Sequence, residues 1–338
     1  MVGRIMLRTL LCQHFGLDHP IFSVGFGTGA GPELAAAVSN AGACGVLGSS
    51  GHPASYVRQQ IQQLRVSTAK PFGVNVILAV MGEGVLEACL EERPPVLVLF
   101  WGDPAPYVEP AHRQGIKVVI QIGSVEEAQA AAEAGVDAII AQGIEAGGHV
   151  KSKTSLWALL PQVVEAVRPV PVIASGGVAD GRGLVAALSL GAQGVSMGTR
   201  FVASEEAFVH PEFKRRVVES RAEHTIYTDL FDVGWPDAPH RALRNRAVEE
   251  WEAAGRPASG QRPGEGSKIG TVARAGKSVD VQKYSAMMLT PEFEGRLDYV
   301  PMWAGESCSQ VNDIKPAARI VHDVVREAEK VIGRLAQP

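Results

Sequence analysis

The sequence lacks the long apolar runs, paired cysteines and charge excess that mark several protein classes. In its 338 residues, no apolar run reaches the roughly 20 residues that a membrane-spanning helix needs. The formal net charge of −4 gives no electrostatic reason to expect a nucleic acid or an anionic membrane as partner. Cys12, Cys44, Cys89 and Cys308 are scattered, with no C-x-x-C spacing. Because unpaired cysteines suit a reducing compartment, we predict a cytoplasmic protein.

A dinucleotide-binding fingerprint and a metal-binding cluster are also missing. The stretch GFGTGAGP follows an apolar run, but a G-x-G-x-x-G motif that begins at Gly27 would require glycine at position 32, which is Pro32. The next apolar run ends in Gly48-Ser49, without an acid for a ribose. No group of histidines, cysteines and carboxylates has convincing ligand spacing, so we predict no catalytic metal. Rossmann-type binding is therefore rejected.

The sequence does have a repeated unit, in which a short apolar run and a glycine or polar break precede an Ala/Glu-rich segment at helical period. Eight such runs lie at 21–24, 44–47, 72–77, 96–100, 117–122, 138–141, 170–174 and 194–197. Because they are apolar throughout and do not alternate, they predict the doubly covered strands of a parallel sheet. Eight strand–helix units predict a (β/α)8 TIM barrel, which is typically about 250 residues long. A doubly wound sheet is the competing architecture, but it usually has about five to seven strands.

Helix signals separate these runs, and the pattern changes after Phe201. PELAAAVSNAG places Pro32 in a first turn, and SVEEAQAAAEAG places Ser124 at an N-cap, with Gly42 and Gly135 as the C-terminal stops. We predict three parts: a barrel at 1–220, a mainly helical lid or substrate subdomain at 221–310 beside the barrel mouth, and a C-terminal helix at 311–338 that packs back on the barrel. RPASGQRPGEG, residues 256–266, is predicted from its composition to be a mobile loop.

Three uncharged amides would meet at the mouth of such a barrel, because residues that directly follow the strands converge there. Asn75, Gln121 and Gln142 come from three different runs. A ring of amides suits a neutral heteroaromatic group with alternating donors and acceptors, such as a flavin edge and its ribityl hydroxyls. The alternative is that the amides satisfy buried loop backbone.

A phosphate site is predicted after the last two runs. One run ends in Ser175-Gly176-Gly177, a helix begins near Asp180, and the next run ends in Ser196-Met197-Gly198-Thr199. Glycines let backbone N–H groups approach a phosphate, and a helix N-terminus adds a favourable dipole. Barrels commonly bind phosphate at this place. Two ordinary tight turns are the alternative, but a mouth-bound aromatic cofactor that carries a phosphate would join this site to the amides.

Several longer motifs carry a resemblance to a known family. PELAAAVSNAG, PFGVNV, AQGIEAGGH, IASGGVADGRG and QGVSMGTRF, with WAG near residue 304, resemble in order and spacing the nitronate monooxygenase family, whose members are FMN-dependent barrels. The resemblance runs from about Leu7 to the final helix. It implies FMN contacts from Asn75, Gln142, Gly147, Gly177 and the phosphate-binding segment Ser196, Met197, Gly198 and Thr199, with backbone at Val24 and Gly25 against the isoalloxazine. From the mouth geometry, Gln121, Gly148, Ser175 and Gly176 complete the predicted cofactor-binding set.

His149 matches the histidine that this family places near the reactive edge of the flavin, and it is the predicted catalytic residue. The pair Gly147-Gly148 would let the loop pass closely over the flavin. An unperturbed pKa near 6.5 allows a histidine to act as a cation or a base at neutral pH. The alternative is a structural histidine bonded to loop carbonyls, and Glu145 is expected to support the loop. The predicted substrate pocket comprises Phe26, Trp101 and Lys151, although Lys151 would also fit a solvated turn.

These inferences predict FMN-dependent oxidation of an alkyl nitronate by dioxygen to a carbonyl compound and nitrite. The alternative is an NAD(P)H-dependent FMN reductase that acts on a quinone or an enoyl thioester, since related reductases share the motifs. A flavin-binding protein without turnover is a third hypothesis. An IMP-dehydrogenase-like barrel would need a cysteine after the sixth run, where none of the four cysteines lies.

Overall fold

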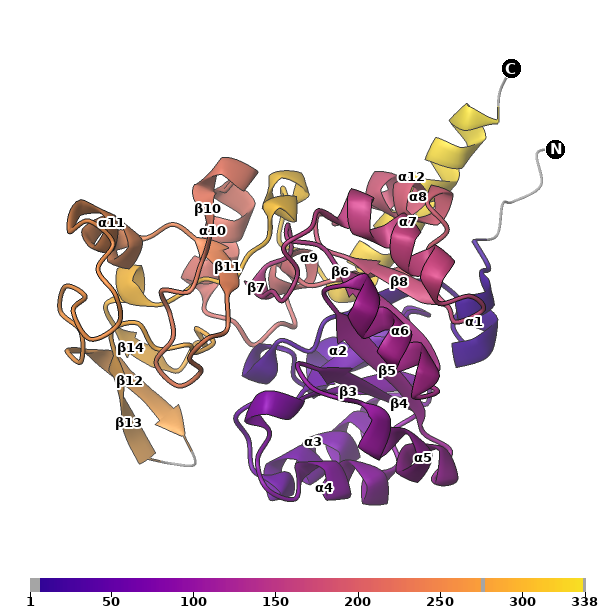
Figure 1. The fold of residues 1–338 in the computed structure, drawn as a ribbon, viewed down its shortest axis with the longest axis horizontal. Helices are drawn as coiled ribbons and strands as arrows, with labels where there is room; N and C mark the ends of the chain where they lie inside the picture. Colours follow the sequence, from indigo (N-terminus) through magenta and orange to yellow (C-terminus); the bar gives the residue numbers. More distant parts are fainter. Residues whose placement is uncertain (1–6, 275–276, 337–338) are drawn as a thin grey trace.

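Eight parallel strands form the main sheet of the computed structural model (Figure 1). The structure describes residues 7–274 and 277–336. The outermost residues of the predicted first and last parts, and residues 275–276, lie outside the described residues. The strands are β1 (Ile21–Ser23), β2 (Gly45–Gly48), β3 (Phe72–Ile77), β4 (Val96–Phe100), β5 (Lys117–Ile122), β6 (Ala138–Gln142), β8 (Val172–Ser175) and β9 (Gly194–Met197). Their order is β1-β9-β8-β6-β5-β4-β3-β2. A parallel bridge between Phe22 and Cys44 joins β1 to β2, so the sheet closes on itself. The predicted TIM barrel is confirmed.

Helices surround the barrel strands. They are α2 (Pro32–Asn40), α3 (Ala54–Ser67), α4 (Val85–Glu92), α5 (Ala105–Arg113), α6 (Val125–Glu133), α7 (Leu156–Ala166), α8 (Gly181–Ser189), α9 (Thr199–Val202) and α10 (Pro211–Glu219), with 3₁₀ turns η1 (Gly27–Gly29) and η2 (Leu78–Val80). As predicted, Pro32 begins α2, and the Ser124 hydroxyl caps α6 by accepting a 3.2 Å hydrogen bond from the amide of Glu127. Gly42 and Gly135 follow these two helices with φ of 87° and 85°, a conformation that glycine adopts freely.

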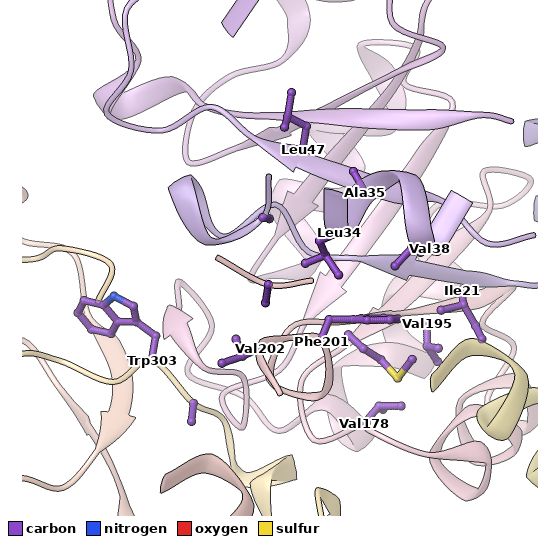
Figure 2. Packing of buried hydrophobic residues seen from close by; sticks show 14 of the residues in the cluster. Ile21, Leu34, Ala35, Val38, Leu47, Val178, Val195, Phe201, Val202 and Trp303 are labelled. Carbon is purple, nitrogen blue, oxygen red and sulfur yellow. The ribbon is translucent and has the colours of Figure 1, made fainter. Parts of the chain in front are cut away.

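Apolar side chains fill the barrel and close one of its ends. Phe22, Val98 and Ile140 belong to a buried cluster that also includes Leu11 and Phe15 from α1 (Leu10–Phe15). A larger cluster lies between strands and helices, and Figure 2 shows several of its members packing around α2 and α9. Because α1 contributes to the interior cluster, it closes the amino-terminal end of the barrel. The carboxyl ends of the strands form the opposite end, which faces residues 221–310.

Residues 221–310 differ from the expected mainly helical subdomain, because two small antiparallel sheets make up most of their regular structure. β10 (Thr225–Thr228) and β11 (His240–Leu243) form one sheet with β7 (Gly148–His149), and β12 (Lys268–Arg274), β13 (Lys277–Gln282) and β14 (Phe293–Gly295) form the other. The helical elements are α11 (Arg246–Ala253) and the 3₁₀ turns η3 (Ala222–His224), η4 (Leu297–Tyr299) and η5 (Glu306–Gln310). The stretch HRALRNRAVEEWEAAG begins as β11, where it pairs with β10, and continues as a helix. The Asn245 side chain then caps α11.

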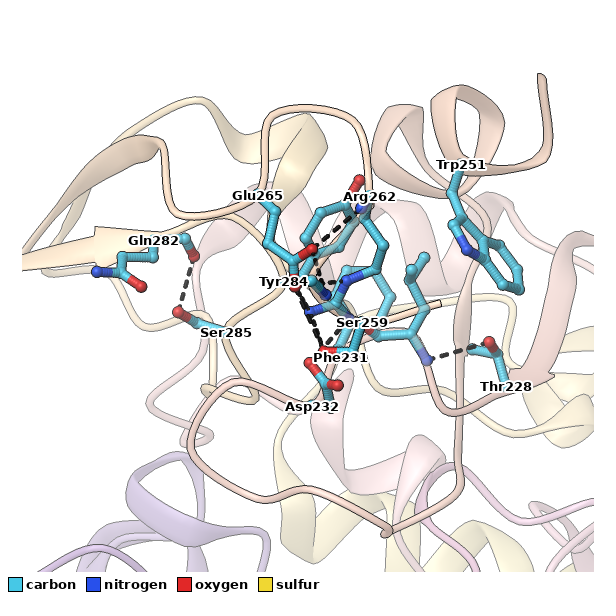
Figure 3. Close-up of polar contacts among 12 residues, drawn as sticks. Thr228, Phe231, Asp232, Trp251, Ser259, Arg262, Glu265, Gln282, Tyr284 and Ser285 are labelled. Atoms are coloured by element: carbon cyan, nitrogen blue, oxygen red, sulfur yellow. Dashed lines mark hydrogen bonds and ion pairs between the residues drawn. The ribbon is translucent and has the colours of Figure 1, made fainter. Parts of the chain in front are cut away.

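Residues 256–266 were predicted to be a mobile loop, but the buried side chain of Arg262 binds this segment to its neighbours (Figure 3). The Arg262 side chain is 3% exposed, and its Nη1 lies 2.8 Å from Asp232 Oδ1 and 2.7 Å from the carbonyl oxygen of Leu230. Its Nε donates to Glu265 at 2.9 Å, and the guanidinium lies 4.5 Å from the centre of the Tyr284 ring. Composition cannot show such a network. This loop therefore ties the connection between β10 and β11 to the end of β13.

The long helix α12 (Ala317–Leu335) returns to the outside of the barrel and contacts α8 and α2. Its Glu327 accepts a 2.8 Å hydrogen bond from the backbone amide of Gly181, the first residue of α8. Gly181 must be small here, because a Cβ would lie 2.4 Å from the amide nitrogen of Ala328. Within residues 7–274 and 277–336, no helix is both long and apolar enough to cross a membrane.

Candidate active site

A cavity of about 530 Å³ lies at the carboxyl ends of the barrel strands. One wall comes from the barrel, and the other comes from residues 233–235, the β12–β13 hairpin, residues 285–288 and Trp303. The cavity brings together most of the residues predicted from the sequence: Val24, Gly25, Phe26, Asn75, Gln121, Gln142, Gly147, Gly148, His149, Ser175, Gly176, Ser196, Gly198 and Thr199. Its volume is typical of a small-molecule site, for which about 300–1,000 Å³ is usual.

Four predicted residues are not among the described residues that line the cavity. Met197 is 1% exposed and packs in the hydrophobic core. Gly177 lies beside the Glu145 side chain, whose Cβ would be 3.6 Å from a Cβ on the glycine. Trp101 stands behind the wall, edge-on to His149 at 6.2 Å between ring centroids. These three positions support the wall and do not form it.

Lys151 was predicted to line the substrate pocket, but its side chain pairs with another residue instead. Its ammonium group pairs with Glu127 of α6 and lies 5.8 Å from the centre of the Trp101 ring. The carboxylate that holds the lysine comes from the preceding helix, so the sequence around Lys151 does not reveal the pair. The lysine is therefore directed to α6, and it supplies no positive charge to the cavity wall.

The predicted amides have different roles. The Gln142 side chain donates from Nε2 to the carbonyl oxygen of His149 at 3.0 Å, and its Oε1 accepts from the amide of Lys151 at 3.4 Å. Asn75 donates from Nδ2 to the carbonyl oxygen of Val98 at 3.1 Å. Gln121 ends in the cavity wall and is partly exposed. Gln142 thus holds the histidine loop, as the loop-backbone alternative predicts, while Gln121 is open to a ligand.

The glycine-histidine loop is fixed by a carboxylate and by close backbone packing. Glu145 accepts hydrogen bonds of 2.9 and 3.1 Å from the amide of Leu156, the first residue of α7, so the glutamate supports the loop as predicted. A Cβ on Gly147 would lie 2.4 Å from the amide nitrogen of Gly305. Gly148 has φ of 72°, and a Cβ there would meet nothing within 4 Å. The first glycine is therefore needed for packing, and the second leaves open space at the cavity.

His149 lies in a cage of aromatic rings. The Trp235 indole stacks on its imidazole, with centroids 4.0 Å apart and planes 30° apart. Trp303 and His240 lie 5.4 and 5.5 Å away. Burial, with a smaller contribution from His240, lowers the pKa of His149 to about 3, so the imidazole is neutral at physiological pH. Its Nε2 is buried without a hydrogen-bond partner among the described residues.

Sequence reasoning missed Trp235 and His240, and it noted Trp303 only as part of the WAG motif. Trp235 lies in the connection between β10 and β11, whose sequence DVGWPDAP carries no catalytic pattern. His240 donates from one ring nitrogen to the carbonyl oxygen of Ala238 at 2.9 Å, and the other accepts from the amide of Phe231 at 3.2 Å. This arrangement defines a neutral histidine with a structural role.

The residues predicted to bind a phosphate lie at the barrel mouth, but the start of α8 is less open than the sequence suggested. The N-terminus of α8 is already satisfied, because Asp180 accepts from the amide of Gly183 and Glu327 accepts from that of Gly181. The short helix α9 begins at Thr199, directly after the cavity-lining residue Gly198. Gly176, with φ of 99°, lines the same region. The turn after β8 and the start of α9 therefore lie at the place where barrels commonly bind phosphate.

The cavity is nearly uncharged. Among the described residues that line it, none is a lysine or an arginine, and Asp280 is the single carboxylate. That aspartate is exposed, and its Oδ1 lies 2.6 Å from Nζ of Lys268. Within the described parts of the chain, no group of three or more His, Cys, Asp or Glu residues is placed to hold a metal ion. The wall therefore offers neutral polar side chains, backbone amides and apolar side chains to a ligand, and no cationic side chain among its described residues.

The barrel, its glycine-lined mouth and the caged histidine form a candidate active site, and comparisons with known proteins give its family. The family model for nitronate monooxygenase matches residues 8–84 and 79–327. The chain is 36% identical over 253 residues to a (3aS,4S,5R,7aS)-5-hydroxy-7a-methyl-1-oxo-octahydro-1H-indene-4-carboxyl-CoA dehydrogenase of Mycobacterium tuberculosis, covering 74% of this chain and 70% of that protein. The chain therefore belongs to the nitronate monooxygenase family.

Two further similarities extend over nearly the whole chain. A nitronate monooxygenase of Paraburkholderia phytofirmans is 30% identical over 378 residues, covering 98% of each protein. The structure of FabK from Thermotoga maritima superimposes with a TM-score of 0.82 at 32% identity, covering 97% of this chain and 98% of that one. Proteins with different names thus share this fold and sequence pattern, so family membership alone does not assign a substrate.

Proposed function

We propose that the cavity binds FMN. The turn at Gly176 and the start of α9 would hold the phosphate, and the Gln121 amide would meet the polar edge of the flavin. The open space beside Gly148 would admit the ring system. Two buried polar atoms of the cavity wall, Ser50 Oγ and His149 Nε2, have no hydrogen-bond partner among the described residues, which fits a wall built for a ligand. FMN would supply electron and hydride transfer there.

We further propose that the enzyme reduces an enoyl thioester with NAD(P)H as the electron donor. The observation that carries this proposal is a neutral His149 in a cavity wall without a lysine or arginine. The enoyl thioester group itself is uncharged and loses little beside this histidine, whereas an anionic reacting group would lose its hydration without gaining an opposite charge. The similarity to the carboxyl-CoA dehydrogenase, whose name gives a CoA thioester as its substrate, supports a thioester for this chain.

His149 would orient the substrate. A neutral imidazole has one N–H donor, and Nε2 is the atom left without a partner. With the proton on Nε2, the ring would donate to the thioester carbonyl oxygen and polarise the conjugated double bond for hydride addition. The stacked Trp235 would fix the ring orientation and exclude water. A pKa of about 3 makes this imidazole a weak base, so hydrogen-bond donation fits it better than proton abstraction.

Oxidation of an alkyl nitronate by dioxygen is the second candidate function. The family model and the relative from Paraburkholderia phytofirmans favour it. In this reaction, the N–H group of His149 and backbone amides of the loop would have to hold the negative oxygens, because the cavity wall offers no cationic side chain among its described residues. The products would be a carbonyl compound and nitrite.

An anaerobic absorbance experiment separates these functions. Purified protein is mixed in turn with NADH, NADPH, trans-2-butenoyl-CoA, ethylnitronate and propionate 3-nitronate. We expect NADH or NADPH to bleach the yellow colour and the enoyl thioester to restore it. Bleaching by a nitronate, with nitrite after air is admitted and no response to the nicotinamides, would establish the second candidate. Colourless protein that FMN cannot reconstitute would overturn the cofactor assignment.

A further inference from the structure

The cavity wall includes a group of aliphatic side chains that come from the barrel and from the second sheet of the subdomain. They are Val272, Val279 and Val281 of the paired strands β12 and β13, with Ile77 at the end of β3 and Val80 in η2. We call this part the valine arm. Figure 1 shows the hairpin standing apart from the barrel, beside the end of the molecule that carries α3 and α4.

The hairpin presents these valines to the cavity through its register. Val272 is paired directly with Val279 across the antiparallel ladder, and Val281 lies two residues further along β13, on the same face. The neighbours Ser278 and Gln282 are exposed and do not line the cavity. One face of the two strands is therefore aliphatic where it lines the cavity, and from the opposite face Asp280, paired with Lys268, also reaches the lining.

Val279 is the most informative residue of the arm. It is 42% exposed, whereas Val272 and Val281 on the same face are 6% and 5% exposed. The protein thus leaves apolar surface uncovered at this point, where an apolar ligand group would cover it. Ser50 lies in the same cavity wall, and its hydroxyl is buried without a partner among the described residues. An apolar arm and an unpaired polar group match a ligand with an apolar chain attached to a polar head.

We propose that the valine arm binds the hydrocarbon part of the acyl group and makes the enzyme select medium-length chains over short ones. This inference rests on the thioester function proposed above. The pantetheine portion of a thioester carries amides that need hydrogen-bond partners, and the aliphatic side chains of the arm have none to offer. An acyl chain needs only apolar contact, which the five side chains of the arm supply.

Binding of enoyl-CoA esters without NAD(P)H tests the proposal, because no turnover then follows. Affinities for trans-2-butenoyl-, trans-2-hexenoyl- and trans-2-octenoyl-CoA are measured by quenching of tryptophan fluorescence, since Trp235 and Trp303 line the cavity. We expect binding to tighten about fourfold for each added methylene until the arm is full. Equal affinities along the series would overturn the proposal.

Matched variants locate the effect. Val279→Asp should weaken octenoyl-CoA binding about tenfold or more and leave butenoyl-CoA binding within about twofold, because only the longer chain reaches the arm. Val279→Leu should keep the preference for long chains. Ser278→Asp places the same charge on the adjacent exposed position outside the cavity and should change neither affinity. Equal losses for both chain lengths in Val279→Asp would contradict the assignment.

A competitor without a thioester distinguishes failure of this inference from failure of the function. Decan-1-ol should bind the arm and compete with octenoyl-CoA, and Val279→Asp should weaken its binding. If decan-1-ol binds in this way but no enoyl-CoA binds, the thioester function fails while the arm remains an apolar-chain site. If butenoyl-CoA restores the colour of the reduced enzyme but chain length has no effect, the arm assignment fails alone.

Discussion

Gly147 and Gly305 lie in direct backbone contact, although 157 positions separate their numbers in the chain. A Cβ on Gly147 would lie 2.4 Å from the amide nitrogen of Gly305, and a Cβ on Gly305 would lie 2.7 Å from the amide nitrogen of Gly147. The amide of Gly305 also donates to the Thr199 hydroxyl at 2.9 Å. The C-terminal WAG segment thus fixes both the histidine loop and the start of α9.

Gly147→Ala should destabilise the protein and displace the histidine loop. Backbone atoms block the new methyl group and cannot rotate away, so we expect the free energy of unfolding to fall by about 1–3 kcal/mol. Urea denaturation measures this loss. Gly333→Ala is the control, because that glycine lies in α12 with nothing within 4 Å of its Cβ position. Alanine should stabilise the helix by up to about 1 kcal/mol. Equal stability of both variants would contradict the contact.

His149 should stay neutral across the physiological pH range. Its pKa is about 3 in the folded protein and about 6.5 in the unfolded chain, so the unfolded chain binds the additional proton between these values. Stability should therefore fall as pH drops from about 6.5 towards 3, on the order of 1.4 kcal/mol per unit. NMR of ¹³C-labelled histidine should show no titration of His149 between pH 5 and 8, and His149→Gln should flatten the acid limb of stability. A titration near pH 6.5 would refute the buried neutral ring.

Arg262→Met should loosen the connection that carries Trp235. Removing one member of a buried ion pair leaves Asp232 without its partner, which typically costs about 3–5 kcal/mol. We expect a lower midpoint of thermal unfolding and a smaller near-ultraviolet circular dichroism signal from the tryptophans. Arg256→Met is the comparison, since that side chain is 63% exposed and its pair with Glu252 should contribute at most about 1 kcal/mol. Similar losses of stability in both variants would show that Arg262 does not hold this connection in place.

Thr199→Val should weaken retention of FMN more than it alters the shape of the site. Valine preserves the volume of the side chain but removes the acceptor for the Gly305 amide, leaving a buried donor unpaired at a cost of about 1–3 kcal/mol. Thr199→Ser keeps the hydroxyl and should retain near-normal affinity. Recovery of flavin fluorescence on dilution measures dissociation of FMN from each variant. Unchanged retention in the valine variant would show that this hydrogen bond does not position α9.

The barrel could be predicted because each of its strands carries its own signal. The runs at 72–77, 96–100, 117–122 and 194–197 coincide with β3, β4, β5 and β9, and all are buried enough to be apolar almost throughout. The residues after the strands were predictable for the same reason, since barrel geometry brings them to one end. Helix caps such as Ser124 are likewise local features.

The subdomain could not be predicted in this way because its elements depend on distant partners. β7 contains only Gly148 and His149, and it becomes a strand by pairing with β11. Trp235 meets His149 only after the connection between β10 and β11 is held by Arg262, which lies in a segment whose composition suggests mobility. The low pKa of His149 depends on this enclosure, so the sequence left its charge state open.

The contact between the EAGGH loop and the WAG segment also has a bearing on biosynthesis. A ribosome releases all eight barrel strands, the last ending at Met197, before it releases Trp303, Ala304 and Gly305. During that interval the nascent barrel lacks the wall that Trp303 provides and the backbone contact that holds Gly147. The proposed cofactor site is therefore completed only after the whole barrel has been synthesised, by a segment that follows the subdomain in the chain.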